Sequence, residues 1–203
     1  MTGALFLTAT LSGVLSAVLL LPLDDLSQTG IAAAATRISA GALMVLVMIA
    51  AIALIPPVLY HVLKEHGEAL ALCYVAARLL EVVVMLPAAA GPLLLVALAR
   101  DGDQLDPVRV VLRAQDAWIY APSSLFFCLG ALLFNAVLYR SRLVPRWISG
   151  WALGAAVLYL TDACLVLFGA LTVSSTVHGL LVAPLAVNEM VLAVWLLVKG
   201  FRR

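Results

Sequence analysis

Three side chains capable of acid–base or ionic chemistry lie inside a stretch that is otherwise apolar. Tyr74, Arg78 and Glu81 are spaced i, i+4 and i+7, which places them on one face of a helix with Arg78 and Glu81 close enough to pair. A charged side chain at the centre of a bilayer costs about 2.5 to 3.5 kcal/mol on insertion scales, so it faces the interior of a helix bundle and marks a functional site. We therefore predict that Glu81 is a candidate catalytic residue and that Tyr74 and Arg78 are candidate ligand-binding residues.

A second group of polar residues lies in the last two apolar stretches. His178 and Glu189 are 11 residues apart, which is close to three helical turns, so these two residues and Asn188 share a helical face. Asp162 lies a few residues beyond the centre of the preceding stretch. We interpret Glu189 and Asp162 as further catalytic candidates, and His178 and Asn188 as ligand-binding candidates.

The charges of this deep set do not balance. Arg78 offers one fixed positive charge to Glu81, Glu189 and Asp162, so at least one of the three carboxyl groups is expected to be protonated at neutral pH. Carboxyl groups in different environments suit acid–base chemistry or proton coupling. The alternative is a buried polar network that only fixes the register of the helices.

Three further charged residues lie nearer the expected outer boundary of the membrane. Arg37, Arg113 and Asp116 are within a turn or two of that boundary, where long side chains reach water, so a surface position is favoured for them. If they instead face inward, Arg37 and Asp116 join the ligand-binding set in a polar cavity that opens toward the outer face.

Apolar stretches of about 20 residues must position all of these groups. Of the 203 residues, 65% are hydrophobic and 11% charged, and the mean hydropathy is +1.15, which excludes an ordinary soluble domain. In hydrocarbon every backbone polar group must be satisfied, and no stretch alternates with the period of a barrel strand. The sequence therefore predicts an all-α integral membrane bundle, forming one domain over 1–203, with six transmembrane helices near 4–23, 38–59, 69–96, 117–138, 148–171 and 177–198.

Prolines interrupt several of these predicted spans. A kink or helix end is expected at Pro56-Pro57, and a break is expected in the outer half of the third span, where Pro87, Gly91 and Pro92 occur. Pro122 and Pro184 lie similarly within spans four and six. Ordinary bending and a transporter-like unwound site both fit this pattern.

The basic residues between the spans predict the orientation. Lys and Arg concentrate in every second connection, and cytoplasmic loops carry such an excess, so both termini are predicted to be cytoplasmic. Trp118 and Tyr120 fall at the predicted outer boundary, as aromatic belt residues do. The basic residues are Lys64, Arg140, Arg142, Arg146, Lys199, Arg202 and Arg203.

Other signals narrow the classes of function. Cys73, Cys128 and Cys164 lie singly in apolar stretches, so neither a disulfide framework nor a metal site is expected. No HExxH, GxSxG or phosphate-loop motif occurs, and no cofactor is predicted. A net charge of +1 offers no basic patch for nucleic acid. The segment 1–23 lacks a basic region and a cleavage site, so it is expected to be a retained first span.

Several motifs resemble one known family. The runs 71–81 (ALCYVAARLLE), 143–149 (LVPRWIS) and 188–190 (NEM) with 194–201 (VWLLVKGF) are similar to the bacterial membrane family called domain of unknown function 4386. The resemblance covers nearly the whole chain and implies a multi-pass protein of the bacterial inner membrane, in contact with the lipid bilayer. It carries no activity, substrate or assigned site.

Three hypotheses of function remain open. The first is a membrane-embedded pocket for a small lipophilic molecule, with acid–base chemistry on that molecule as an extension that would make the protein an enzyme. The second is proton-coupled transport or export, in which a homo-oligomer would complete a pathway through close contacts at small residues such as Gly130, Ala131, Gly150 and Gly154. The third is a non-catalytic membrane subunit whose buried charges fix helix packing.

Overall fold

The computed structural model is helical throughout the part of the chain that it describes. These residues are 2–20, 26–101 and 106–201, without the side chains of residues 28, 107, 113, 116 and 117. No strand occurs within these ranges, and six helical segments are long and apolar enough to cross a membrane. The predicted all-α bundle with six spans is therefore confirmed.

Five of the spans are single helices and one is divided into two. The third span comprises α4 and α5, which Leu86 separates. A short helix that the sequence did not predict, α2, follows the first span and is capped by the Ser27 side chain, which accepts a hydrogen bond from the Gly30 amide at 3.2 Å. The helices are α1 (Thr2–Leu20), α2 (Gln28–Ala33), α3 (Ala35–Leu63), α4 (Glu68–Met85), α5 (Pro87–Asp101), α6 (Asp106–Ser141), α7 (Arg146–Leu167) and α8 (Thr176–Val198), with a 3₁₀ turn at Lys64–His66.

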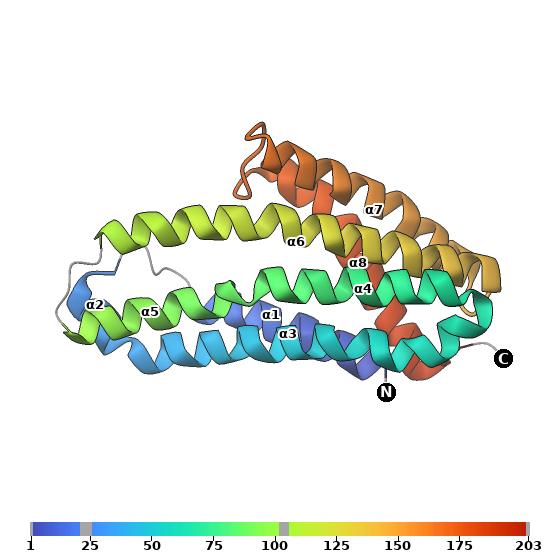
Figure 1. The fold of residues 1–203 in the computed structure, drawn as a ribbon, viewed down its shortest axis with the longest axis horizontal. Helices are drawn as coiled ribbons and strands as arrows, with labels where there is room; N and C mark the ends of the chain where they lie inside the picture. The colour runs from blue at the N-terminus through green and yellow to red at the C-terminus, as the bar shows by residue number, and fades with distance from the viewer. Residues whose placement is uncertain (1, 21–25, 102–105, 202–203) are drawn as a thin grey trace.

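The spans are arranged as a ring. Each spanning helix packs against the next one along the chain, since α1 contacts α3, α3 contacts α4, α4 contacts α6, α6 contacts α7 and α7 contacts α8. The contact between α8 and α1 closes the ring. In Figure 1 α1 begins and α8 ends at the same end of the bundle, as an even number of antiparallel spans requires. We call this end the terminal end.

Basic residues gather at the terminal end. Lys64 lies in the turn between α3 and α4, Arg142 lies between α6 and α7, and Lys199 follows α8. Arg142 adopts a left-handed backbone conformation, with φ of 58°, and its amide donates to the Leu138 carbonyl at 3.0 Å as α6 ends. The basic residues that the sequence places in alternate connections therefore lie at one end of the bundle. The cytoplasmic placement of this end stays a prediction.

The prolines act differently in the different spans. The expected break in the third span is confirmed at Leu86, directly before Pro87. At Pro56-Pro57, where a kink or a helix end was expected, the helix end is wrong, because α3 continues to Leu63. Pro56 is buried and Pro57 is exposed within this helix, and packing against α1 and α4 offsets the loss of the amide donors.

The end of the bundle opposite to the terminal end extends farther than the predicted spans. In Figure 1 α3, α5 and α6 continue past the turn that joins α7 and α8. A small apolar cluster from α2, α3 and α5 holds this extension together, with Ile31 and Ile38 fully buried. The helix α6 begins about three turns before the predicted boundary of its span, because its first turns find helical neighbours instead of a loop.

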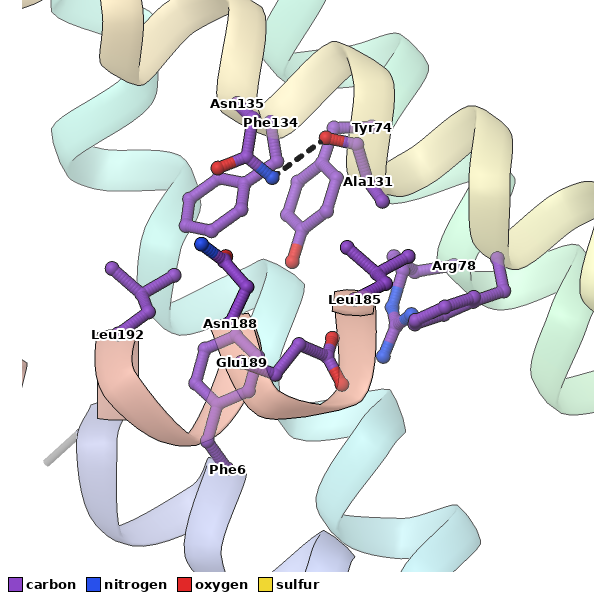
Figure 2. Close-up of a pocket in the computed structure, with 11 residues that line it drawn as sticks. Phe6, Tyr74, Arg78, Ala131, Phe134, Asn135, Leu185, Asn188, Glu189 and Leu192 are labelled. Atoms are coloured by element: carbon purple, nitrogen blue, oxygen red, sulfur yellow. Dashed lines mark hydrogen bonds between the residues drawn. The ribbon is translucent and has the colours of Figure 1, made fainter. Parts of the chain in front are cut away.

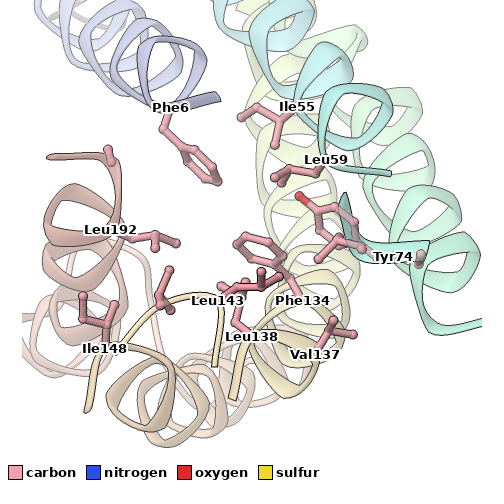
Figure 3. Close-up of a cluster of buried hydrophobic side chains, with 14 residues drawn as sticks. Phe6, Ile55, Leu59, Tyr74, Phe134, Val137, Leu138, Leu143, Ile148 and Leu192 are labelled. Atoms are coloured by element: carbon pink, nitrogen blue, oxygen red, sulfur yellow. The ribbon is translucent and has the colours of Figure 1, made fainter. Parts of the chain in front are cut away.

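A cluster of buried apolar side chains, here called the plug, closes the ring at its terminal end. It includes Phe6, Leu59, Tyr74, Phe134, Leu138 and Leu192. Above this plug, a void of about 20 Å³ lies at the centre of the ring between α1, α4, α6 and α8; Figure 2 shows the side chains around it. Within the plug, the rings of Phe6 and Tyr74 each stack on the ring of Phe134, with centroid distances of 6.5 Å and 5.2 Å. Figure 3 shows Phe6, Phe134 and Leu192 filling the interior from three different helices. Arg78, Glu81 and Glu189 lie beyond this plug, on the side away from the terminal end.

Candidate functional site

Arg78 and Glu81 form a buried ion pair on α4. The Arg78 Nη1 and Glu81 Oε2 atoms are 2.9 Å apart, and the two side chains are 6% and 5% exposed. Tyr74, one turn earlier, is also buried. The predicted common face of the three residues is therefore present, and it points into the ring. A buried pair of this kind is costly to desolvate, so both charges must be held in good geometry.

The helix α6 supplies the space that Arg78 needs. A Cβ atom built on Gly130 would lie 2.9 Å from Cδ and 3.5 Å from Cγ of Arg78, so only glycine lets the side chain pass at this distance. One turn before Gly130, the ring of Phe127 lies under the Arg78 guanidinium at 5.2 Å from its centroid, a cation–π arrangement. Gly130, which the sequence suggested for contacts between copies, instead serves close packing within the chain.

Glu189 approaches the same pair from α8. In Figure 2 its carboxyl group points toward the guanidinium of Arg78, and Arg78 interacts electrostatically with both Glu81 and Glu189. Among the described residues, however, the Glu189 carboxyl group forms no ion pair within 4.0 Å. The structure thus brings together the three charged residues that the sequence singled out near mid-depth, with one guanidinium for two carboxyl groups.

A cavity of about 320 Å³, here called the chamber, lies beside these charges. It occupies the half of the bundle remote from the terminal end, between α4, α6, α7 and α8, and both Glu81 and Glu189 line it. This volume is within the range of small-molecule pockets, about 300 to 1,000 Å³. The remaining lining residues are Met85, Tyr120, Ser123, Ser124, Phe127, Tyr159, Val182 and Ala186.

Helical periodicity explains how these side chains reach one cavity. On α6 the lining residues Tyr120, Ser123, Ser124 and Phe127 have the spacing i, i+3, i+4 and i+7 of a single face. The same face continues toward the plug with Gly130.

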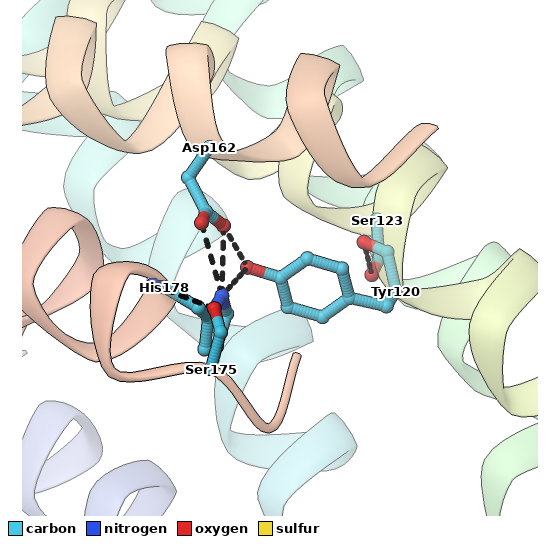
Figure 4. Close-up of polar contacts among 5 residues, drawn as sticks. All are labelled: Tyr120, Ser123, Asp162, Ser175 and His178. Atoms are coloured by element: carbon cyan, nitrogen blue, oxygen red, sulfur yellow. Dashed lines mark hydrogen bonds and ion pairs between the residues drawn. The ribbon is translucent and has the colours of Figure 1, made fainter. Parts of the chain in front are cut away.

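A second polar cluster joins α6, α7 and α8 beside the chamber. Asp162 is fully buried; the Tyr120 hydroxyl donates to its Oδ2 atom at 2.6 Å, and Nδ1 of His178 lies 3.0 Å from both carboxyl oxygens. Figure 4 shows the tyrosine and histidine converging on the carboxyl group from different helices. Asp162 and His178 are thus neighbours, as members of one cluster, but neither of them lines the chamber.

Local structure positions His178. The Ser175 side chain caps α8 and accepts a hydrogen bond from the His178 amide at 3.2 Å, which fixes the first turn of the helix. Tyr120 connects this cluster to the chamber, because it lines the chamber and also donates to Asp162. Tyr120 therefore faces the interior of the bundle, whereas Trp118 is 62% exposed, as a belt residue would be. The position of both residues at the outer boundary of the membrane stays a prediction.

The other predicted binding residues lie elsewhere. Asn188 is buried and its Nδ2 atom donates to the Ile148 carbonyl of α7 at 2.9 Å, so it ties two helices together. Asn188 and Tyr74 line the central void and not the chamber. Arg37 lies in the first turn of α3 and lines neither cavity. The side chain of Asp116 lies outside the described residues.

The comparisons with known proteins identify the family. The model of the family described as "Domain of unknown function (DUF4386)" matches residues 1–200. The chain belongs to this family. No curated protein and no solved structure matches it. Membership supports a multi-pass membrane protein and assigns no activity, so the chemistry of this DUF4386 chain must be argued from its own residues.

Sequence reasoning missed most of the chamber wall. Phe127, Tyr159 and Met85 are ordinary apolar residues by type, and only their position beside Glu81 and Glu189 gives them significance. One signal was available on α6, where polar Ser123 and Ser124 and aromatic Phe127 recur on one helical face of the DUF4386 chain. Within the described residues no group of three metal-ligating side chains occurs, so the chamber is organised around carboxyl groups and aromatic rings.

Proposed function

We propose that this protein binds a small lipophilic molecule in the chamber, within the membrane. The observation that carries the proposal is that two carboxyl side chains from different helices, Glu81 and Glu189, line one cavity of about 320 Å³. Keeping such groups beside an open volume is costly. A ligand with a polar group would offset this cost, while the apolar walls accommodate the rest of the molecule.

The position of the chamber favours a ligand that arrives from the bilayer. The chamber lies within the spanning part of the bundle and the apolar plug closes the terminal end. Its walls are largely aromatic and aliphatic side chains, which suit a molecule that partitions into lipid. Acid–base chemistry on the bound molecule is an extension of this proposal, since both carboxyl groups face the same volume.

The test is mass spectrometry of small molecules extracted from the purified protein. Ala186 lines the chamber, so Ala186→Trp should fill it, and the adjacent Val187, which is 52% exposed and lines neither cavity, gives the matched control Val187→Trp. A discrete compound that is not a phospholipid should accompany the wild type and Val187→Trp and be lost from Ala186→Trp. Bulk phospholipid alone in all three samples would overturn the proposal. A pair of isomeric compounds would indicate that a reaction takes place.

Proton-coupled transport is a second candidate, and a specific observation favours it. Leu86 and Pro87 interrupt the third span directly after Met85, which lines the chamber. Pro184 lies in α8 between the lining residues Val182 and Ala186. Prolines beside a membrane cavity mark positions where transporter helices bend. Uptake of the co-purified compound into proteoliposomes under an imposed proton gradient, and its absence without the gradient, would support transport over binding alone.

A further inference from the structure

Among the described residues, the wall of the chamber carries acidic side chains and no basic ones. Of the lining residues that the structure describes, Glu81 and Glu189 carry carboxyl groups, and none is Lys, Arg or His. The guanidinium of Arg78, which pairs with Glu81, lines the central void instead. A ligand in the chamber therefore meets carboxyl oxygens as its charged partners.

The single guanidinium cannot offset both carboxyl groups. Arg78 is engaged by Glu81 at 2.9 Å and by the ring of Phe127. Glu189, in contrast, forms no ion pair within 4.0 Å among the described residues. The chamber consequently has one carboxyl group in excess, which must hold a proton or meet a positive charge from outside the protein.

Three aromatic side chains line part of the same volume. Phe127 and Tyr159 pack with their centroids 5.3 Å apart, and Tyr120 forms a third aromatic wall. The faces of such rings attract organic cations, most strongly where water is excluded. Met85, Val182 and Ala186 add apolar surface, which suits a cation with hydrocarbon substituents better than an inorganic ion.

Other ligand classes fit less well. A fatty acid or a phosphate ester would bring a negative charge toward two carboxyl groups, with no basic side chain among the described residues of the wall. A metal ion would lack ligands, because the described residues contain no group of three suitable side chains. A neutral molecule would leave Glu189 either to share the Arg78 guanidinium with Glu81 or to hold a proton.

We propose that the ligand of the chamber is a lipophilic cation, such as a hydrophobic amine or quaternary ammonium compound, with Glu189 as its counter-ion. This inference rests on the proposed binding function and adds the substrate class. Glu81, which is paired with Arg78, contributes negative electrostatic potential and hydrogen-bond acceptors, but it is not the principal partner of the cation. Phe127, Tyr159 and Tyr120 form the walls against which the cation packs.

Three probes of similar bulk and different charge test the inference. Equilibrium binding of tetraphenylphosphonium, tetraphenylborate and triphenylmethanol is measured on the protein in nanodiscs, with empty nanodiscs subtracted. We expect saturable binding of the phosphonium ion at least about tenfold tighter than that of the other two probes. Glu189→Gln should weaken its binding at least about tenfold, because a unit of opposite charge is lost at short range. The exposed Glu65 gives the matched control Glu65→Gln, which should change nothing.

The outcomes separate the two proposals. If the borate or the neutral probe binds as tightly as the phosphonium ion and Ala186→Trp abolishes that binding, the chamber is a binding site but the cation inference is overturned. If no probe binds saturably, the cation inference fails, and the compounds extracted from the wild type and from Ala186→Trp decide the proposed function separately. Should Glu189→Gln not fold, Glu189→Asp replaces it: retained phosphonium binding supports the inference, and a preference for the borate ion overturns it.

Discussion

Two clusters of ionisable side chains lie within the membrane-spanning part of this bundle, and they are built in opposite ways. In the cluster of Tyr120, Asp162 and His178, the buried carboxyl group receives a tyrosine hydroxyl at 2.6 Å and an imidazole nitrogen at 3.0 Å. In the cluster of Arg78, Glu81 and Glu189, one guanidinium serves two carboxyl groups, and Glu189 has no close ion pair among the described residues.

The difference separates a cluster that joins helices from one that faces open volume. The carboxyl group of Asp162 is fully buried and its partners come from α6 and α8, so both of its oxygen atoms have hydrogen-bonding partners within the protein. Glu81 and Glu189 instead line the chamber. A satisfied network stabilises a fold, whereas an unbalanced one beside a cavity is what a ligand site requires.

The largest expected effect comes from breaking the ion pair. Arg78→Met leaves Glu81 buried without its cation, so the free energy of unfolding should fall by about 3–5 kcal/mol. Thermal unfolding of the detergent-solubilised protein measures this change. The double variant Arg78→Met, Glu81→Gln should recover most of the loss, and equal losses in the single and double variants would show that the pair is not the source of the effect.

A somewhat smaller loss is expected where α6 passes Arg78. Gly130→Ala places a methyl group 2.9 Å from Cδ of Arg78, so the ion pair must shift, and overpacking of this kind costs about 1–3 kcal/mol. Gly154 has no atom within 4 Å of an added Cβ, which makes Gly154→Ala the matched control without a loss. Unfolding curves that are the same for the two variants would contradict the packing argument.

The satisfied cluster should respond more weakly to the loss of one partner. Tyr120→Phe removes the hydroxyl that donates to Asp162 while His178 remains in place, and a lost hydrogen bond costs about 0.5–1.5 kcal/mol. The Ser123 hydroxyl bonds only to carbonyls of its own helix, so Ser123→Ala should cost less. A larger loss for Ser123→Ala would mean that Tyr120 is not what ties α6 to α7.

The smallest effect on stability is expected at Glu189. Because its carboxyl group has no close ion pair among the described residues, Glu189→Gln should change the free energy of unfolding by less than about 0.5 kcal/mol while it weakens binding of the phosphonium probe. Comparison with Arg78→Met in the same thermal assay checks this prediction. A loss as large as that of Arg78→Met would place Glu189 in a structural network and remove the contrast between the two clusters.

Much of the site could be found from residue type and spacing. Tyr74, Arg78 and Glu81 were predicted to share one face of a helix, and the structure places all three inside the ring. Asn188 and His178 were predicted from the same kind of argument, yet one ties α8 to α7 and the other belongs to the Asp162 cluster. Periodicity assigns a face to each side chain and does not reveal which helix lies opposite.

The sequence by itself determined that this is an all-α membrane bundle with six spans, and that a few charged residues must face its interior. These conclusions follow from hydrocarbon as a solvent, which forbids unsatisfied backbone groups and exposed charges. Only the tertiary structure decided that Glu81 and Glu189 share a chamber while Asp162 is sealed beside it. The reason is that helix packing sets which faces meet, and that depends on side chains such as Gly130 and Phe127, whose contacts span distant parts of the chain.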